Sequence, residues 1–234
     1  MTVALLERAA AALGPLVEDV VFVGGATLGV WITDPAAPEP RPTLDVDVVL
    51  EVTSRGRFAA FEAKLRDRGF LEDQESGVIC RWSHRSSALI LDVMPSDPTI
   101  LGFASPWYPL VVSDPRPHRL PSGATIAVVE PALFLATKLE AFRGRGGGDY
   151  FGSRDFGDVI ALVDGREEVI DDVRAAAGSI RAFIAAELRA HLDASRFTDG
   201  VYGALHGDPA SQARAQAVVL PRITGIVEAA ERGA

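Results

Sequence analysis

The chain has 234 residues, 48% of them hydrophobic and 24% charged, a balance typical of a globular protein with one large domain or two small ones. Its formal net charge of -9 argues against a broadly basic surface for nucleic acid, although a local basic groove is compatible with that total. The single cysteine, the absence of a signal-peptide pattern at the N-terminus and the lack of a long apolar run predict a cytoplasmic protein with no membrane segment.

The first half of the chain alternates between helical and strand patterns. A helix is expected over residues 3–13, a strand over 19–23 and a short helix over 26–33. The loop over 34–42 contains four prolines and is expected to cross the surface. The next elements are a strand over 44–52, a helix from the Ser54 cap to Arg68, strands over 78–82 and 88–94, a proline-rich irregular region over 95–123 with a short strand at 110–113, and a strand over 125–129.

The second half of the chain is predicted to be helical. Pro131 suits a first helical turn, and Ser153 is a natural N-cap after a glycine-rich loop over 144–152. Helices are expected over 132–142, 154–163, 171–177, 180–192 and 218–230. The chain is therefore predicted to be an α/β fold, with a mixed sheet and flanking helices in residues 1–129 and a C-terminal helical region in residues 130–234 that completes the active-site cleft.

Three aspartates are the strongest candidates for chemistry. Side chains alternate along a strand, so Asp45 and Asp47 project from the same face of the strand over 44–52. Two like charges this close repel, and a divalent cation would remove that cost. Asp92 is the lone charged residue of an otherwise apolar strand, and if the two strands are neighbours the three carboxylates converge on a site suited to Mg²⁺. The alternative is that Asp92 only ends a strand near Pro95.

Gly24 and Gly25 lie between a strand and a helix, where backbone amides can approach a phosphate. A plain strand-to-helix turn is the alternative. Gly24, Ala26 and Gly29 also approximate the glycine fingerprint of dinucleotide-binding proteins. Ala26 breaks that fingerprint at the glycine that lets the pyrophosphate approach, so a Rossmann-like protein ranks low.

The helices of the second half carry further candidates. Lys138 shares a helix face with apolar residues, so it either extends its ammonium to water or points it at a triphosphate. Arg154, Asp155 and Asp158 open the next helix, where an aspartate in the first turn is also favoured by the helix dipole alone. The glycine run over 144–148 is interpreted as a linker between helices, with a phosphate-binding loop as the alternative.

Taken in order, these residues resemble the nucleotidyltransferases of the DNA polymerase β-like superfamily, and most closely the AbiEii/MenT-type toxins of type IV toxin–antitoxin systems. The resemblance covers about residues 19–163. Gly25 stands where the family usually has a serine, and the loop over 34–42 lengthens the interval before the aspartates. The segments that carry the resemblance are Val23-Gly24-Gly25, Leu44-Asp45-Val46-Asp47-Val48, Asp92, Ala136-Thr137-Lys138-Leu139 and Ser153-Arg154-Asp155-Phe156-Gly157-Asp158.

The resemblance implies a polymerase-β-like fold and the Mg²⁺- or Mn²⁺-dependent transfer of a nucleoside monophosphate from an NTP to an acceptor. It implies catalytic roles for Asp45, Asp47, Asp92, Lys138 and Asp155, metal binding by the first three of these, and nucleotide binding by Gly24, Gly25, Lys138, Arg154 and Asp158. A non-catalytic nucleotide-binding or partner-binding module with the same fold is the alternative.

The sequence does not identify the acceptor of the nucleoside monophosphate. A tRNA or another RNA would need a basic groove, for which Arg143, Arg145, Arg154 and Arg166 are candidates. A small molecule or a protein hydroxyl is equally compatible with the composition. The resemblance to toxins also makes a cognate antitoxin a candidate partner.

Overall fold

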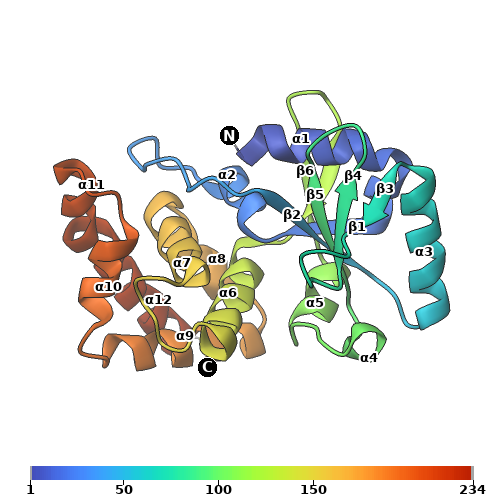
Figure 1. The fold of residues 1–234 in the computed structure, drawn as a ribbon. Coiled ribbons are helices and arrows are strands. Elements are labelled where there is room, and N and C mark those ends of the chain that lie inside the picture. The colour runs from blue at the N-terminus through green and yellow to red at the C-terminus, as the bar shows by residue number, and fades with distance from the viewer. Residues whose placement is uncertain (1, 233–234) are drawn as a thin grey trace. The chain divides into compact units, whose positions relative to one another are not determined.

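A computed structural model describes residues 2–232 and shows an α/β fold built on a mixed sheet (Figure 1). The described residues form a seven-stranded sheet in the order β3-β4-β5-β2-β1-β7-β6. β2 pairs in parallel with β5 and antiparallel with β1, so the two strands expected to carry the aspartates are central neighbours. The strands are β1 (Val20–Val23), β2 (Asp45–Leu50), β3 (Phe70–Glu72), β4 (Arg81–His84), β5 (Ile90–Pro95), β6 (Arg116–Arg119) and β7 (Thr125–Val128).

Helices precede, connect and follow these strands. In the first 130 residues they are α1 (Thr2–Leu13), α2 (Leu28–Trp31), α3 (Arg55–Asp67), α4 (Pro98–Leu101) and α5 (Tyr108–Ser113), with 3-10 turns at Gly14–Asp19 and Gly25–Thr27. The later helices are α6 (Pro131–Arg145), α7 (Arg154–Gly165), α8 (Val169–Ala175), α9 (Gly178–Leu192), α10 (Phe197–Ala204), α11 (Pro209–Arg214) and α12 (Leu220–Arg232), with a π-helical turn at Ala215–Val219. No helix among the described residues is long and apolar enough to span a membrane.

The side chains of β2 explain its central place. Val46 and Val48 are completely buried on one face, as the alternating pattern predicts. Asp45 and Asp47 are half-buried on the other face, while Val49 is buried there too. β2 is therefore apolar on both faces at its end and charged on one face at its start.

Most of the expected elements are present. The strands expected at 19–23, 44–52, 88–94 and 125–129 correspond to β1, β2, β5 and β7. The predicted caps are confirmed, because Ser54 Oγ accepts a hydrogen bond from the Arg57 amide and Ser153 Oγ accepts one from the Phe156 amide, both at 3.3 Å.

Several sequence-based expectations were wrong. The short strand expected at 110–113 is part of helix α5: Pro109 lies in its first turn, and the amides of Leu110 and Val111 donate to the carbonyl of Trp107. The strand expected at 78–82 begins only at Arg81. The helix expected at 26–33 is a 3-10 turn followed by the short α2. The elements β3, β6, α4, α10 and α11 were not predicted from the sequence.

The described chain divides into two compact units. The sheet unit contains residues 2–30 and 41–130, and the helical unit contains residues 31–40 and 131–232. The change between Glu130 and Pro131 lies next to the boundary expected from the sequence. The segment 31–40, which the sequence-based division assigned to the first region, belongs to the helical unit.

Specific contacts hold the segment 31–40 within the helical unit. The backbone amides of Thr33 and Asp34 both donate to the Gly165 carbonyl at the end of α7, at 2.8 and 2.9 Å. The Asp34 carboxylate accepts a 2.6 Å hydrogen bond from Arg214 Nη2, and Arg214 Nε also binds Asp164 at 2.7 Å. Polar contacts thus fix this proline-rich segment along part of its length.

Candidate functional site

The three aspartates lie on one face of the sheet. In the parallel register of β2 and β5, Asp47 is paired with Asp92 and Asp45 is paired with Ile90. Paired residues of neighbouring strands project to the same side, so Asp92 shares the face of Asp45 and Asp47. The strand adjacency on which the carboxylate prediction depends is therefore confirmed. Asp92 is the most buried of the three, with 7% of its surface exposed.

The glycine turn after β1 packs directly against Asp47. β1 and β2 are antiparallel, and Val23 at the end of β1 pairs with Asp47. Gly24 has a φ of 71°, and a β-carbon built on it would lie 1.9 Å from Asp47 Oδ2. The Gly24 carbonyl accepts hydrogen bonds from Thr27, at 3.1 Å from its amide and 2.8 Å from its hydroxyl. Thr27 therefore fixes the Gly24 carbonyl towards the following helical turn, and the α-carbon of Gly24 packs against Asp47.

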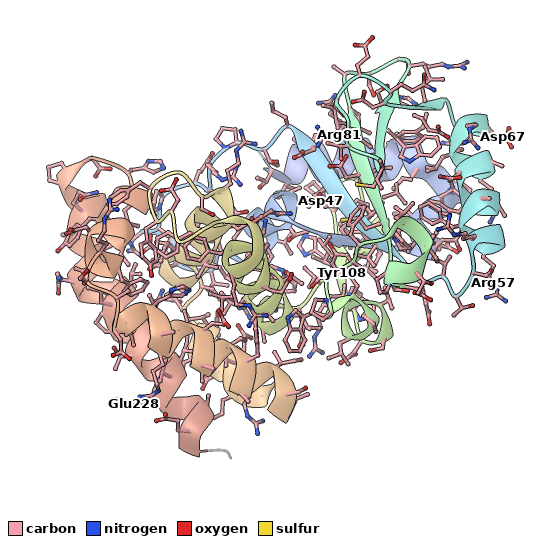
Figure 2. All side chains as sticks on the ribbon, turned by 60° about the horizontal axis from the view of Figure 1, so that its bottom comes forward. Asp47, Arg57, Asp67, Arg81, Tyr108 and Glu228 are labelled. Carbon is pink, nitrogen blue, oxygen red and sulfur yellow. The ribbon has the colours of Figure 1, made fainter. Side chains whose placement is uncertain are left out.

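An arginine that the sequence analysis did not select joins this group. Arg81 on β4 pairs with Asp92 on β5 in the antiparallel register. Its guanidinium donates to both oxygens of Asp92, from Nε at 2.8 Å and from Nη2 at 2.7 Å, and Nη2 also donates to Asp45 Oδ2 at 2.8 Å. Figure 2 shows Arg81 and Asp47 on the strands of the sheet unit. Arg81 therefore bridges two of the three predicted metal ligands.

These charges change the acid–base behaviour of their surroundings. The hydrogen bonds from Arg81 to Asp92 raise the pKa of Arg81 above its ordinary value, although partial burial opposes the shift. The neighbouring Cys80 is buried, and this burial, together with the carboxylates of Asp92 and Asp47, raises the pKa of its thiol to about 12. Cys80 is therefore a protonated, inert thiol at neutral pH.

One end of this sheet face is covered by helix α5. The Tyr108 hydroxyl donates a 3.1 Å hydrogen bond to Met94 Sδ, and Met94 lies two residues after Asp92 on the same face of β5. Val49 of β2, which pairs with Met94, is completely buried. The apolar end of the face is thus closed, and the half-buried Asp45 and Asp47 lie towards its other end.

The carboxylates offer the oxygen atoms that a metal ion needs, but most of these oxygens already accept hydrogen bonds from protein groups. Carboxylate oxygens are the donors that Mg²⁺ and Mn²⁺ prefer. Asp45 Oδ1 accepts a 2.9 Å hydrogen bond from Thr43, so both oxygens of Asp45 and both oxygens of Asp92 accept hydrogen bonds from protein donors. Over residues 2–232, no three Asp, Glu, His or Cys side chains are grouped as metal ligands. A cation held by Asp45 and Asp92 would share these oxygens with the donors or replace them.

The other predicted residues lie in the helical unit. Lys138 on α6 extends its ammonium to α7, where it binds Asp155 Oδ1 at 3.2 Å and Asp158 Oδ2 at 2.7 Å. Asp155 and Asp158 are 6% and 1% exposed, so the contacts neutralise buried charges. Burial alone would raise the pKa of Asp155, but Lys138 and Arg145 outweigh it and hold that pKa below the ordinary value. The ammonium of Lys138 is directed at α7 rather than extended to water.

The arginines considered for a basic groove have different surroundings. Arg145 donates to Asp155 from Nε at 2.9 Å, and Arg143 Nη1 binds Glu187 at 2.7 Å. Arg166 forms a two-pronged contact with Asp172 and lies over the Trp31 ring, 5.4 Å from its centroid. Arg154 at the start of α7 is exposed. Three of the four candidate arginines are thus engaged with acidic side chains.

The antiparallel pairing of β1 and β2 contradicts the dinucleotide-binding alternative. The glycine fingerprint belongs to a βαβ unit whose two strands are parallel and are joined by a crossover helix. Here the strands on either side of Gly24 run in opposite directions, and α2 between them has four residues. The segment from β1 to β2 is therefore not a Rossmann-type unit.

Comparison with known proteins adds no family assignment. No protein-family model matches the chain, and no curated protein matches it in sequence. The functional argument therefore depends on the residues and their geometry.

Proposed function

We propose that this chain is a nucleotidyltransferase of the DNA polymerase β-like superfamily, similar to the AbiEii/MenT-type toxins. The observation that carries the proposal is the register of β2 and β5, which pairs Asp47 with Asp92 and keeps Asp45 on the same face. The glycine turn against Asp47 supports it, because a strand, a glycine turn and an aspartate strand occur in the order that the resemblance implies.

The sheet unit would supply the reacting centre. Asp45, Asp47 and Asp92 would hold Mg²⁺ or Mn²⁺, which when bound would offset the charge on the α-phosphate and the leaving pyrophosphate. The half-buried Gly24 would offer its backbone to the phosphates of the NTP, whereas Gly25 is buried in the turn. The acceptor oxygen would form a bond to the α-phosphorus as the bond to pyrophosphate breaks, and Asp92 would take the proton of an attacking hydroxyl.

In this proposal the helical unit would supply cationic side chains. Lys138 and the exposed Arg154 carry the positive charge that the NTP phosphates require. Asp155 and Asp158 hold the Lys138 ammonium in a fixed position through the contacts between α6 and α7. These two carboxylates would act by positioning the lysine rather than by contacting the nucleotide.

The acceptor in this proposal belongs to one of three classes, which are a tRNA or another RNA, a small molecule, or a protein hydroxyl. The acidic net charge and the pairing of Arg143, Arg145 and Arg166 with carboxylates disfavour a broad RNA surface. A cytoplasmic location and a cognate antitoxin are parts of the same proposal.

The first prediction tests transfer directly. The purified protein is incubated with each α-labelled NTP, Mg²⁺ and total RNA, and with its own chain as a protein acceptor. We expect Asp45→Asn and Asp47→Asn each to lower the rate of label transfer by about a hundredfold or more, because each removes one charged oxygen ligand from the reacting centre. Electrophoresis and thin-layer chromatography of the products measure the label in RNA, protein and small molecules.

The matched control is Asp67→Asn, which makes the same chemical change at the exposed end of α3 (Figure 2). It should transfer label at the rate of the unmodified protein. Circular dichroism establishes that all three variants are folded. Full activity in both Asp45→Asn and Asp47→Asn would refute the assignment of these residues.

A non-catalytic nucleotide-binding or partner-binding module is the second candidate. The observation in its favour is that Arg81 already neutralises part of the carboxylate group, as it would in a face that needs no metal. Such a module would label none of the acceptors in the same incubation, although it could still bind an NTP.

A further inference from the structure

The contact between Arg81 and the aspartates is more than a surface ion pair. Arg81 reaches Asp92 with two parallel hydrogen bonds, the strongest arrangement for a guanidinium and a carboxylate. The side chains of Arg81 and Asp92 are 21% and 9% exposed, so the pair is shielded from water. A second contact to Asp45 then connects β4, β5 and β2 through one positive charge.

A divalent cation and Arg81 would compete for these oxygens. A Mg²⁺ ion held by Asp45 and Asp92 would use carboxylate oxygens to which the Arg81 guanidinium donates at 2.7 to 2.8 Å. Two cations that share carboxylate oxygens repel each other. This repulsion favours binding of the ion in an arrangement in which Arg81 has given up some of its hydrogen bonds.

We propose that Arg81 is an internal counter-cation of the carboxylate site, a positioning residue that holds Asp45 and Asp92 together in the metal-free protein and is displaced when a divalent cation binds. The proposal rests on the proposed function, since it assumes that these aspartates bind the ion. Arg81 keeps a charged, partly buried site stable before the metal arrives, and it lowers the affinity of the site for the metal. A merely structural arginine would supply stability without affecting metal affinity.

The experiment measures Mn²⁺ binding to the full chain without nucleotide. Free Mn²⁺ is titrated by electron paramagnetic resonance in the unmodified protein, in Arg81→Gln and in Arg81→Lys. We expect Arg81→Gln to bind Mn²⁺ about tenfold more tightly, because the ion no longer has to displace hydrogen bonds from a charged donor. Arg81→Lys should lie between them, because an ammonium keeps the charge but lacks the fork that holds both oxygens of Asp92.

Thermal unfolding provides a second readout. Without Mn²⁺, Arg81→Gln should unfold at a lower temperature than the unmodified protein, because Asp92 loses its counter-ion. Saturating Mn²⁺ should raise the unfolding temperature of Arg81→Gln by more than that of the unmodified protein. If Arg81→Gln does not fold without metal, recovery of its folded spectrum on addition of Mn²⁺ supports the proposal and failure to recover contradicts it.

The matched control is Arg85→Gln, which removes the same charge from an exposed position in the turn that follows β4. It should bind Mn²⁺ as the unmodified protein does, which separates a local effect from a change in net charge. Equal or weaker binding in Arg81→Gln would overturn this inference alone and leave the metal site intact. Failure of every variant to bind Mn²⁺ would overturn both this inference and the metal-dependent proposal.

Discussion

Gly24 shows how one residue can be required by its neighbours. Its φ of 71° is a conformation that residues with a β-carbon rarely adopt, and the space that a β-carbon would need is filled by Asp47 Oδ2. A side chain at this position would displace the Asp47 carboxylate, which lies opposite Asp92. The glycine is therefore necessary for the arrangement of the aspartates, independently of any role in contacting phosphate.

A prediction at the residue scale concerns Cys80. Its thiol is 5% exposed and its pKa is raised to about 12, so very little thiolate forms near neutral pH. We expect alkylation by iodoacetamide at pH 8 to be slower in the folded protein than in urea by about three orders of magnitude. Mass spectrometry of the alkylated chain at successive times measures both rates.

The pH dependence of that reaction gives a further check. Between pH 7 and pH 9 the rate in the folded protein should rise about tenfold per pH unit, because the pH stays below the raised pKa and the thiolate fraction keeps growing. In urea the rate should level off near the ordinary pKa of a thiol. A plateau near pH 8.5 in the folded protein would contradict the raised pKa.

At the residue scale, the sequence identified the three aspartates but not Arg81, the arginine that binds two of them. Asp45, Asp47 and Asp92 stood out because each is a charge in an apolar strand pattern. Arg81 did not, because its position opposite Asp92 depends on the antiparallel register of β4 and β5. The usable signal was an arginine between Cys80 and Trp82, in a segment expected to be a strand.

At the scale of elements, one lysine of α6 makes two of the ionic contacts with α7. Lys138 supplies an ammonium to two carboxylates of α7 while its own side chain is 12% exposed. Removing one member of a buried ion pair leaves an uncompensated charge, which is more costly than removing an exposed pair. The two helices should therefore be sensitive to the loss of this side chain.

The corresponding prediction is that Lys138→Ala lowers the free energy of unfolding by about 3 to 5 kcal/mol at pH 7. The pKa of Asp155 is lowered in the folded protein, so its contribution is present above the ordinary value of 3.8 and is lost as the pH falls through the lowered pKa. The deficit of the variant should accordingly shrink below pH 3.8. Urea unfolding followed by circular dichroism at several pH values measures it.

A suitable control is Lys64→Ala, because Lys64 is 60% exposed and its distance to Asp19 is 3.6 Å. An exposed pair of this kind contributes at most about 1 kcal/mol. The result also separates the two interpretations of Lys138. A variant with unchanged stability and no transfer activity would contradict the structural role and favour direct contact with the triphosphate.

Elements with a clear periodicity of apolar residues and a capping residue were predictable from the sequence, and short elements were not. The stripe of Phe58, Phe61 and Leu65 after the Ser54 cap identified α3, and all three side chains are buried. β3 has three residues and offers no usable alternation. α5 contains adjacent valines that favour a strand by propensity, but its first-turn proline favours the helix.

At the scale of the whole molecule, the change from sheet to helices near Glu130 follows from composition and period. The membership of the segment 31–40 does not, because it depends on contacts with residues more than a hundred positions away. Asp34 looks like an ordinary loop residue in the sequence. In the helical unit it is a half-buried partner of Arg214, whose other carboxylate partner, Asp164, is 2% exposed.

The prediction at this scale is that Asp34→Asn loosens the helical unit and not the sheet. The substitution keeps an oxygen for the Ala36 amide and removes the charge that binds Arg214. We expect a loss of about 1 to 3 kcal/mol, because Arg214 retains Asp164. Hydrogen exchange measured by mass spectrometry should become faster in α11 and at the end of α7, with β2 and β5 unchanged.

Glu39→Gln is the control, since Glu39 is exposed on the same segment and the change also removes one negative charge. Its exchange pattern should match that of the unmodified protein. Faster exchange in β2 or β5, with α7 and α11 unaffected by Asp34→Asn, would show that the segment supports the sheet instead.

The interleaved course of the chain has a practical consequence for dividing the protein. The segment 31–40 belongs to the helical unit but lies in the chain between the glycine turn and β2 of the sheet unit. No single cleavage can therefore separate the two units with all their residues. A fragment that ends at residue 129 would contain the segment 31–40 without the helices that it contacts. A fragment that starts at residue 130 would lack Asp34 as a partner for Arg214. Isolating the helices would require this segment to be added back as a separate peptide or fused to them in a rearranged gene.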